Sequence, residues 1–288
     1  MERRETTTTP LASMIPRLPS IWSGAAIGGV RLSVQSCENR PVIPRYFVVA
    51  EREHEIQNPT SEEKLRLLGE RLRLGPDSRV LDIASGRGGP ALVLAQTFGC
   101  RIDGIEVAPE FHAAGVERVE VRRLSHLVSF RLGDASREVL PPSEYDAALC
   151  LGASFVYGSL ADTVEALAPA VKPGGHVVVG EPYWRRLPLP DEYEDRGDPW
   201  TTLADTVLIF ETSGLPVVTV ISSSEDDWDR YETLHWRACE EWLVANPEDP
   251  DAADIRSRHE RHKRIYLSQG REYLGWAIFV GWKPHGSP

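Results

Sequence analysis

The stretch VLDIASGRGGPALVLA, residues 80–95, decides the fold of this chain. An apolar strand ends at Asp82, a turn with three glycines follows, and a helix begins at Pro90. Glycine lets the backbone approach a ligand closely, and proline suits the first helical turn, where its missing N–H costs nothing. The free N–H groups at that end of the helix can bind the anionic end of a ligand. The stretch therefore predicts a strand, a ligand-binding loop and a helix.

Short apolar runs alternate with helical patterns on both sides of this loop. We expect strands at residues 79–84, 101–106, 127–132, 145–151 and 176–181, with helices at 89–98, 109–124 and 160–171 between them. We expect a helix at 201–213, a strand at 216–222, a long charged helical stretch at about 226–272 and a last strand at 274–282. Alternating β and α elements predict an α/β fold, with a parallel sheet covered by helices on both faces.

Three classes of ligand bind to glycine loops of this kind. A P-loop is excluded, because it requires a lysine that is absent after these glycines. The dinucleotide pattern GxGxxG/A is formally matched from Gly86 to Ala91, and Glu106 lies twenty residues beyond Gly86. Asp82, four residues before Gly86, suits a ligand that bears an ammonium group, whereas it would repel a pyrophosphate.

Four motifs follow one another between residues 79 and 182. The first runs from Asp82 to Gly88, the second is the acidic residue Glu106, and the third is Gly133-Asp134-Ala135. The fourth combines YDAALCLGAS with LAPAVKPGGHVVVGEP. Their order and spacing resemble the class I S-adenosylmethionine-dependent methyltransferases, whose first motif is D-x-G-x-G-x-G. The chain departs from that motif at Ala84, where the first loop glycine is usual.

This resemblance implies a Rossmann-like, seven-stranded, mostly parallel sheet that binds S-adenosylmethionine and yields S-adenosylhomocysteine. In the family, the acidic residue that matches Glu106 binds both ribose hydroxyls, and the site that matches Asp134 contacts the adenine amino group. Asp134 read alone could also form an Asx turn. The implied cofactor-binding residues are Asp82, Ala84, Ser85, Gly86, Gly88, Glu106, Val107, Gly133, Asp134, Ala135 and Leu151.

Apart from Glu181, which is in the fourth motif, the residues that could bind and activate a methyl acceptor lie outside these motifs. In an open parallel sheet, ligands bind beyond the carboxyl ends of the strands, where Glu181 follows the fifth strand. About fifty residues separate Ser222 from Tyr273, which predicts a helical lid inserted before the last strand. The candidates for a catalytic base are Glu181, His54 and His235. The candidates for acceptor binding are Tyr46, Tyr183, Trp184, Trp228, Tyr231 and Trp236.

Composition excludes several other classes of protein. The 288 residues include 43 acidic and 32 basic side chains, so the net charge is −11. Nucleic-acid binding requires clustered lysine and arginine, and a membrane span requires about 18 consecutive apolar residues. The acidic excess argues against a nucleic-acid-binding protein, and no apolar run approaches the length of a membrane span. The four cysteines lack CxxC spacing and indicate neither a zinc site nor a disulfide framework. We expect a cytoplasmic protein, either a monomer or a homodimer.

Two further segments lie outside the motifs that indicate the reaction. Residues 1–40 are polar or broken by glycines, which predicts a flexible leader without a targeting signal. His259 and His262 have the spacing of metal ligands, but the basic residues around them favour a solvated helix face. No metal site is therefore predicted.

Together these patterns predict an enzyme that methylates a small molecule at carbon or nitrogen. The acceptor is expected to be a heteroaromatic (indole-like) or amine natural product in secondary metabolism. A non-methylating cyclase or isomerase that uses the same cofactor fold and a dinucleotide-dependent oxidoreductase remain as alternatives. We divide the chain into a leader (1–40), an N-terminal helical cover (41–75), a cofactor-binding core (76–223), a helical lid (224–272) and a final strand with tail (273–288).

Overall fold

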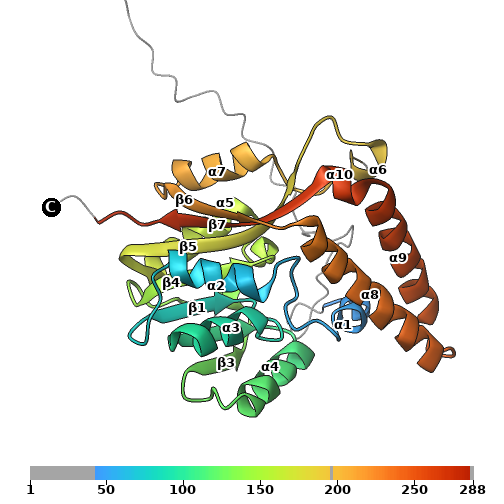
Figure 1. Cartoon of the computed structure of the whole chain (residues 1–288), viewed down its shortest axis with the longest axis horizontal. Coiled ribbons are helices and arrows are strands. Elements are labelled where there is room, and N and C mark those ends of the chain that lie inside the picture. Colours follow the sequence, from blue (N-terminus) through green and yellow to red (C-terminus); the bar gives the residue numbers. More distant parts are fainter. Residues whose placement is uncertain (1–42, 195–196, 286–288) are drawn as a thin grey trace, which may run out of the picture.

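One mixed sheet organises the protein. The computed structural model describes residues 43–194 and 197–285, so the predicted leader lies outside the described residues. Within those ranges the sheet has seven strands in the order β3-β2-β1-β4-β5-β7-β6 (Figure 1). They are β1 (Arg79–Ile83), β2 (Arg101–Glu106), β3 (Val128–Leu132), β4 (Tyr145–Leu151), β5 (Val171–Trp184), β6 (Val217–Ser222) and β7 (Leu274–Trp282). Strands β1 to β5 are parallel, and β7 is antiparallel to both β5 and β6. The predicted mostly parallel sheet is confirmed.

Helices cover both faces of this sheet, as predicted. On one face, α2 (Glu62–Arg71), α3 (Gly89–Phe98) and α4 (Pro109–Val121) share an apolar core with β1 and β2. On the other face, α5 (Leu160–Leu167) and α7 (Leu203–Thr212) pack against β4, β5 and β7 (Figure 1). Strands β4 and β7 are buried on both faces, which explains why they read as continuous apolar runs in the sequence.

Local signals account for the ends of several elements. Ser61 is the N-cap of α2, and its side chain accepts a hydrogen bond from the backbone N of Lys64 at 3.2 Å. The helix expected at 160–171 ends at Leu167, and Ala168–Ala170 continue as a 3₁₀ turn that contains a proline. The strand expected at 176–181 extends to Trp184, because β5 pairs with β7 as far as Trp184 opposite Leu274.

The link between β6 and β7 forms the lid, which we define as residues 225–273. It contains α8 (Glu225–Ala245), α9 (Ala252–Ile265), a π-helical turn (Tyr266–Gly270) and α10 (Arg271–Tyr273). Ser224 and Asp227 form a capping box that starts α8. The short helix α1 (Arg45–Ala50) packs against α8 and α9 through Tyr46 and Val49, although 180 or more residues separate them (Figure 1). No helix in the described ranges is both long and apolar enough to span a membrane.

Residues 51–60 connect α1 to α2, and we call them the crossing segment because they run across the glycine loop. These residues belong to the predicted N-terminal helical cover (41–75), but they form turns after Ala50. The backbone N of Arg87 donates to Oε1 of Gln57 at 2.6 Å, and the amide of Asn58 donates to the carbonyl oxygen of Leu151 at 3.3 Å. These bonds fasten the crossing segment to the ends of β1 and β4.

Replacing Gly89 by alanine is expected to loosen the crossing segment. A Cβ atom at this position would lie 2.0 Å from the carbonyl oxygen of Glu55, so backbone would have to move. We expect the free energy of unfolding to fall by about 1–3 kcal/mol, as for other overpacked sites. Chemical denaturation measures this change. Gly75→Ala is the matched control, because no atom lies within 4 Å of its added Cβ, and equal midpoints for the two variants would contradict the prediction.

Candidate active site

A cavity of about 900 Å³ lies at the carboxyl ends of the parallel strands. Asp82, Glu106, Leu151 and Glu181, at or next to the ends of β1, β2, β4 and β5, line it. The strand order reverses between β1 and β4, which is where open α/β sheets bind ligands. Ligand sites in proteins typically measure about 300–1,000 Å³, so the cavity can hold a cofactor beside a small acceptor.

Two buried carboxyl groups face the glycine-loop end of the cavity. Glu106 accepts hydrogen bonds from the backbone N of Gly86 and of Ala108, each at 2.7 Å. Asp82 is 2% exposed, and its Oδ2 has no hydrogen-bond partner among the described residues. Burial, and to a smaller extent the nearby charge of Glu106, raises the pKa of Asp82 to about 7. An unpartnered buried carboxyl of this kind is prepared to receive a cationic group.

Ten of the eleven residues predicted to bind the cofactor line this cavity. They are Asp82, Ala84, Ser85, Gly86, Glu106, Val107, Gly133, Asp134, Ala135 and Leu151. The exception is Gly88, which is not part of the cavity wall and instead precedes α3 with a φ of +77°. Ala84 has a φ of +54°, so it adopts the left-handed backbone conformation that glycine adopts freely. For an alanine this conformation costs about 1–2 kcal/mol.

Asp134 forms the turn that the sequence left open and also lines the cavity. Its Oδ1 accepts a hydrogen bond from the backbone N of Ser136 at 3.1 Å, as in an Asx turn. Its Oδ2 lies 3.1 Å from Nε of Arg137. The residue also lines the cavity, so the turn fixes its side chain at the glycine-loop end of the cavity.

Glu181 lies on the other side of the cavity, at the end of β5 that faces the lid. Its Oε1 accepts a hydrogen bond from Oγ of Ser154 at 2.9 Å. Burial raises the pKa of Glu181 to about 7, and the bond from Ser154 partly opposes this rise. The carboxyl group can therefore hold or release a proton near neutral pH, which is the property that a general base requires.

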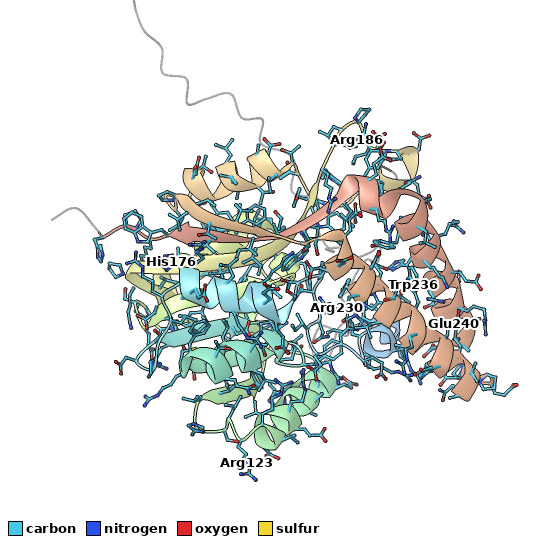
Figure 2. All side chains as sticks on the ribbon, in the orientation of Figure 1. Arg123, His176, Arg186, Arg230, Trp236 and Glu240 are labelled. Atoms are coloured by element: carbon cyan, nitrogen blue, oxygen red, sulfur yellow. The ribbon has the colours of Figure 1, made fainter. Side chains whose placement is uncertain are left out.

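The residues predicted to bind the acceptor divide into two groups. Trp228 and Tyr231 of α8 line the cavity. The other four lie outside the cavity wall, namely Tyr46, Tyr183, Trp184 and Trp236. Tyr46 packs against the lid, and pairing with β7 holds Tyr183 and Trp184 in the extended β5. Trp236 lies between α8 and α9, against Tyr266 and Lys263 (Figure 2).

Other aromatic residues supply the cavity wall that these four were expected to form. They are Phe47, Phe155, Tyr193, Trp200, Tyr266 and Trp276. Trp276 pairs with Pro182 across the sheet, and Phe47 is the residue directly after the predicted Tyr46. The sequence carries no local motif for them, because they belong to segments that meet only in the folded chain.

His54 and His235 meet at Glu51, which the sequence analysis did not single out. Nε2 of His235 lies 2.9 Å from Oε1 of Glu51, and Oη of Tyr231 donates to the same oxygen at 2.9 Å. His54 lies on the other side of Glu51, with its Nδ1 3.6 Å from Oε2. Glu51 and His235 line the cavity, whereas His54 lies behind them. Burial lowers the pKa of His235, but the Glu51 carboxylate outweighs this effect and leaves the pKa above its ordinary value.

The second pair of histidines lies in the lid, apart from this cluster. The expectation of a solvated helix face is wrong for His259, which is buried and contacts Oε1 of Glu240 through Nε2 at 3.1 Å. Nδ1 of His262 lies 3.3 Å from Oη of Tyr46. Each histidine therefore packs α9 against a different neighbour, and the two do not form a joint site with the cluster at Glu51.

The raised pKa of Asp82 predicts a pH dependence of ligand binding. As the pH rises through about 7, Asp82 ionises, and the buried charge destabilises the ligand-free protein. A ligand ammonium group beside the carboxylate offsets this destabilisation, so the ionised protein binds the ligand more tightly. Affinity for S-adenosylhomocysteine is therefore expected to increase up to about tenfold per pH unit below pH 7 and to level off above it.

Calorimetry between pH 5.5 and 8 measures this dependence. Asp82→Asn should bind about 10–100-fold more weakly above pH 7, with a flat profile, because it loses a hydrogen bond to a charged group. Glu181→Gln is the control, since it removes the other cavity carboxyl with a pKa of about 7 and should keep the slope. If the affinity of Asp82→Asn still rose steeply with pH, the group whose ionisation controls binding would not be Asp82.

The sheet and its cavity define a class of protein. A 3-2-1-4-5-7-6 strand order with an antiparallel β7, a glycine loop after β1 and an acidic residue at the end of β2 are the features of class I S-adenosylmethionine-dependent methyltransferases. A family model described as a methyltransferase domain matches residues 80–175.

Relatives and solved structures agree with this class. The chain is 37% identical over 243 residues to YjhP of Escherichia coli (strain K12), a match that covers 83% of this chain and 98% of YjhP. A S-adenosylmethionine-dependent methyltransferase from Geobacter sulfurreducens, solved with S-adenosylhomocysteine, is 36% identical with a TM-score of 0.78, over 83% of this chain and 98% of that one. Glycine/sarcosine/dimethylglycine N-methyltransferase of Actinopolyspora halophila is 26% identical over 124 residues, 42% of this chain and 22% of that enzyme.

The chain belongs to the S-adenosylmethionine-dependent methyltransferases, and S-adenosylmethionine is its cofactor. The described residues fit that molecule. The unpartnered Oδ2 of Asp82 suits its ammonium group, and Gly86, with a φ of +56°, places backbone without a side chain in the cavity wall. Of the functions that the sequence left open, methyl transfer is the one confirmed.

Proposed function

We propose that this methyltransferase acts on a nitrogen atom of a small, flat amine of the kind found in secondary metabolism. The observation that carries the proposal is the lining of the acceptor half of the cavity, which we define as the part formed by α1, the lid and the ends of β5 and β7. This part combines aromatic walls with carboxylates.

Aromatic side chains form two groups in the acceptor half. Trp228 and Tyr266 have ring centroids 6.3 Å apart and an interplanar angle of 29°, and Trp276 belongs to the same apolar cluster. Trp200 lines the cavity from the side of β5, where it packs on Trp184. Flat walls of this kind favour a ring system, because aromatic rings stack or meet edge to face.

The charges of the acceptor half favour an amine over an anionic acceptor. Glu181 and Glu232 line it, whereas the only lysine or arginine of the described cavity wall is Arg137, which pairs with Asp134 at the glycine-loop end. Glu51 is paired with His235 and adds little net charge. A carboxylate or phosphate on the acceptor would therefore lack a cationic partner, while an amine gains one or two carboxylates and aromatic faces.

Each part of the cavity is assigned a task in the reaction. When bound, S-adenosylmethionine supplies a methyl group that is already activated for transfer. We assign Asp82 to its ammonium group, Glu106 to its ribose and Asp134 to its adenine, which places the methyl group toward the acceptor half. Alignment of two reactants in this way can contribute about 7–11 kcal/mol to lowering the barrier.

Glu181 is assigned the acid–base task. An ammonium group cannot attack the methyl carbon, because its lone pair holds a proton. The ionised carboxylate of Glu181 accepts that proton, which frees the nitrogen lone pair to attack the methyl carbon. The N-methyltransferase of Actinopolyspora halophila, whose name gives glycine, sarcosine and dimethylglycine as its acceptors, supports nitrogen as the attacking atom.

A matched panel of acceptors tests the proposal. Purified full-length protein is incubated with S-adenosylmethionine and pairs of ring compounds that differ only in an amine, hydroxyl or carboxylate substituent. Mass spectrometry identifies the methylated atom, and formation of S-adenosylhomocysteine gives the rate. We expect kcat/KM to be highest for the amine of each pair. Preference for the carboxylates, or transfer to ring carbon in compounds that offer an amine, would overturn the proposal.

A further inference from the structure

We propose that Glu51, His54 and His235 form a binding site for one divalent transition-metal ion of the zinc type. The three side chains are buried, and one ligand atom from each lies within 4.8 Å of the other two. Two imidazoles and one carboxylate are the ligands that zinc and its neighbours in the periodic table accept, whereas magnesium and calcium prefer oxygen alone. The inference does not rest on the proposed function, whose charge argument concerns the protein without this ion.

The hydrogen bonds of His54 orient its ring as a metal ligand. Nε2 of His54 lies 2.9 Å from the carbonyl oxygen of Tyr231, which can only accept, so the proton of this bond belongs to Nε2. A neutral ring then presents the lone pair of Nδ1 to Glu51. Metal-bound histidines usually donate their other ring N–H to a carbonyl or carboxylate in this way, because that bond fixes the tautomer and the ring angle.

Two acceptor atoms face each other at this point. Nδ1 of His54 and Oε2 of Glu51 are 3.6 Å apart, and neither has a hydrogen-bond partner in the described part of the chain. Buried acceptors that lack a partner are costly, and they repel one another unless a cation lies between them. A proton could serve as that cation, but 3.6 Å exceeds the length of an N–H···O bond. Ligands held about 2.0–2.2 Å from a tetrahedral zinc ion lie about 3.4 Å apart, which matches the observed spacing.

The remaining ligand approaches from the lid. Nε2 of His235, on α8, lies 2.9 Å from Oε1 of Glu51, and Oη of Tyr231 donates to the same oxygen. Tyr231 therefore supports two of the three ligands, one through its carbonyl group and one through its hydroxyl group. Support of this kind from outside the ligand shell is typical of a built metal site.

The site opens toward the acceptor half of the cavity. Glu51 and His235 line the cavity, and His54 closes the opposite side. Three protein ligands with one open position are typical of a metal that also binds water or a substrate atom. The ion would therefore join the crossing segment, through Glu51 and His54, to His235 of the lid.

Cobalt(II) provides the test, because its visible absorption reports coordination without any assay of activity. Full-length protein is freed of metal with a chelator and titrated with Co²⁺ and, by calorimetry, with Zn²⁺, in the absence of cofactor and acceptor. We expect one equivalent to bind, with the absorption of an ion coordinated by nitrogen and oxygen. Absence of specific binding to the wild-type protein would overturn the proposal whatever the outcome of the acceptor panel.

Variants locate the bound ion. Glu51→Gln and His54→Ala should each weaken binding by more than the 10–100-fold typical of outer partners, and Tyr231→Phe by about that factor. His259→Ala is the matched control, because it removes a buried histidine of the lid that is outside the cluster. Circular dichroism checks that each variant is folded. Unchanged affinity in folded Glu51→Gln and His54→Ala would refute the site, as would an equal loss in His259→Ala.

Discussion

Glu181→Gln is expected to lower kcat by about 10²–10⁴-fold while it changes the acceptor KM much less. The amide keeps the shape of the side chain, so the substitution removes the proton-accepting group and leaves the cavity wall in place. Glu181 can accept a proton only when ionised, and its pKa is about 7. In the wild-type protein kcat should therefore rise with pH through about 7, and in the variant this rise should be absent.

Ser154→Ala is the companion variant, because it retains the carboxyl group and changes only its environment. Oγ of Ser154 donates to Oε1 of Glu181, and this bond favours the ionised form. Its loss should raise the pKa of Glu181 and move the rise in kcat to higher pH. A profile that stays in place, or an unchanged kcat in Glu181→Gln, would show that the proton leaves the acceptor by another route.

The same carboxyl group makes a prediction for stability that needs no acceptor. The pKa of Glu181 in the folded protein is above its ordinary value, so its stabilising contribution is present at low pH and is lost as the pH rises through about 7. The unfolding temperature of Glu181→Gln minus that of the wild type should therefore be more positive at pH 8 than at pH 5. Differential scanning calorimetry of the ligand-free proteins measures both values.

Glu106→Gln is expected to abolish most of the affinity for the cofactor. Both carboxylate oxygens of Glu106 accept from backbone N–H groups, one from Gly86 and one from Ala108. An amide must place its own NH₂ against one of these donors, which loses a charge-assisted bond of about 1.5–3 kcal/mol and leaves a buried N–H without a partner. Together with the ribose contact assigned to Glu106, this predicts affinity for S-adenosylhomocysteine at least 100-fold weaker, or about 2.7 kcal/mol.

Calorimetry with S-adenosylhomocysteine measures the loss, and thermal unfolding of the ligand-free protein measures the damage to the loop. Glu110→Gln is the matched control, because Glu110 is exposed in the first turn of α4, four residues farther along the chain. Affinity in Glu106→Gln within a few-fold of the control would mean that Glu106 only fastens the loop and does not bind the cofactor.

The sheet and the glycine-loop end of the cavity could be predicted from the sequence because their signals are local. Each parallel strand is a short apolar run, and the residue that lines the cavity is at or just after its end, as with Asp82, Glu106 and Leu151. The loop that carries such a residue is part of the same motif as its strand. The misplaced Gly88 belongs to the same turn and was expected in the wall only because the motif includes it.

The acceptor half could be predicted only in part, because its residues come from segments far apart in the chain. Glu51 and His235 are 184 residues apart, and nothing near Glu51 in the sequence indicates this contact. Aromatic residues of α8 illustrate a second limit. Trp228 and Trp236 are eight residues apart, which is about 80° around a helix, enough to place one in the cavity and the other between helices. Sequence spacing alone does not tell which of the two faces inward.

The crossing segment has a consequence for turnover. Its residues Gln57 and Asn58 line the cavity and are bonded to the glycine loop and to the end of β4. If the product binds as proposed, it can leave on that side only after these bonds open. We therefore expect the residence time of the product, more than the methyl transfer itself, to limit the steady-state rate, and a burst of product in the first turnover to reveal this.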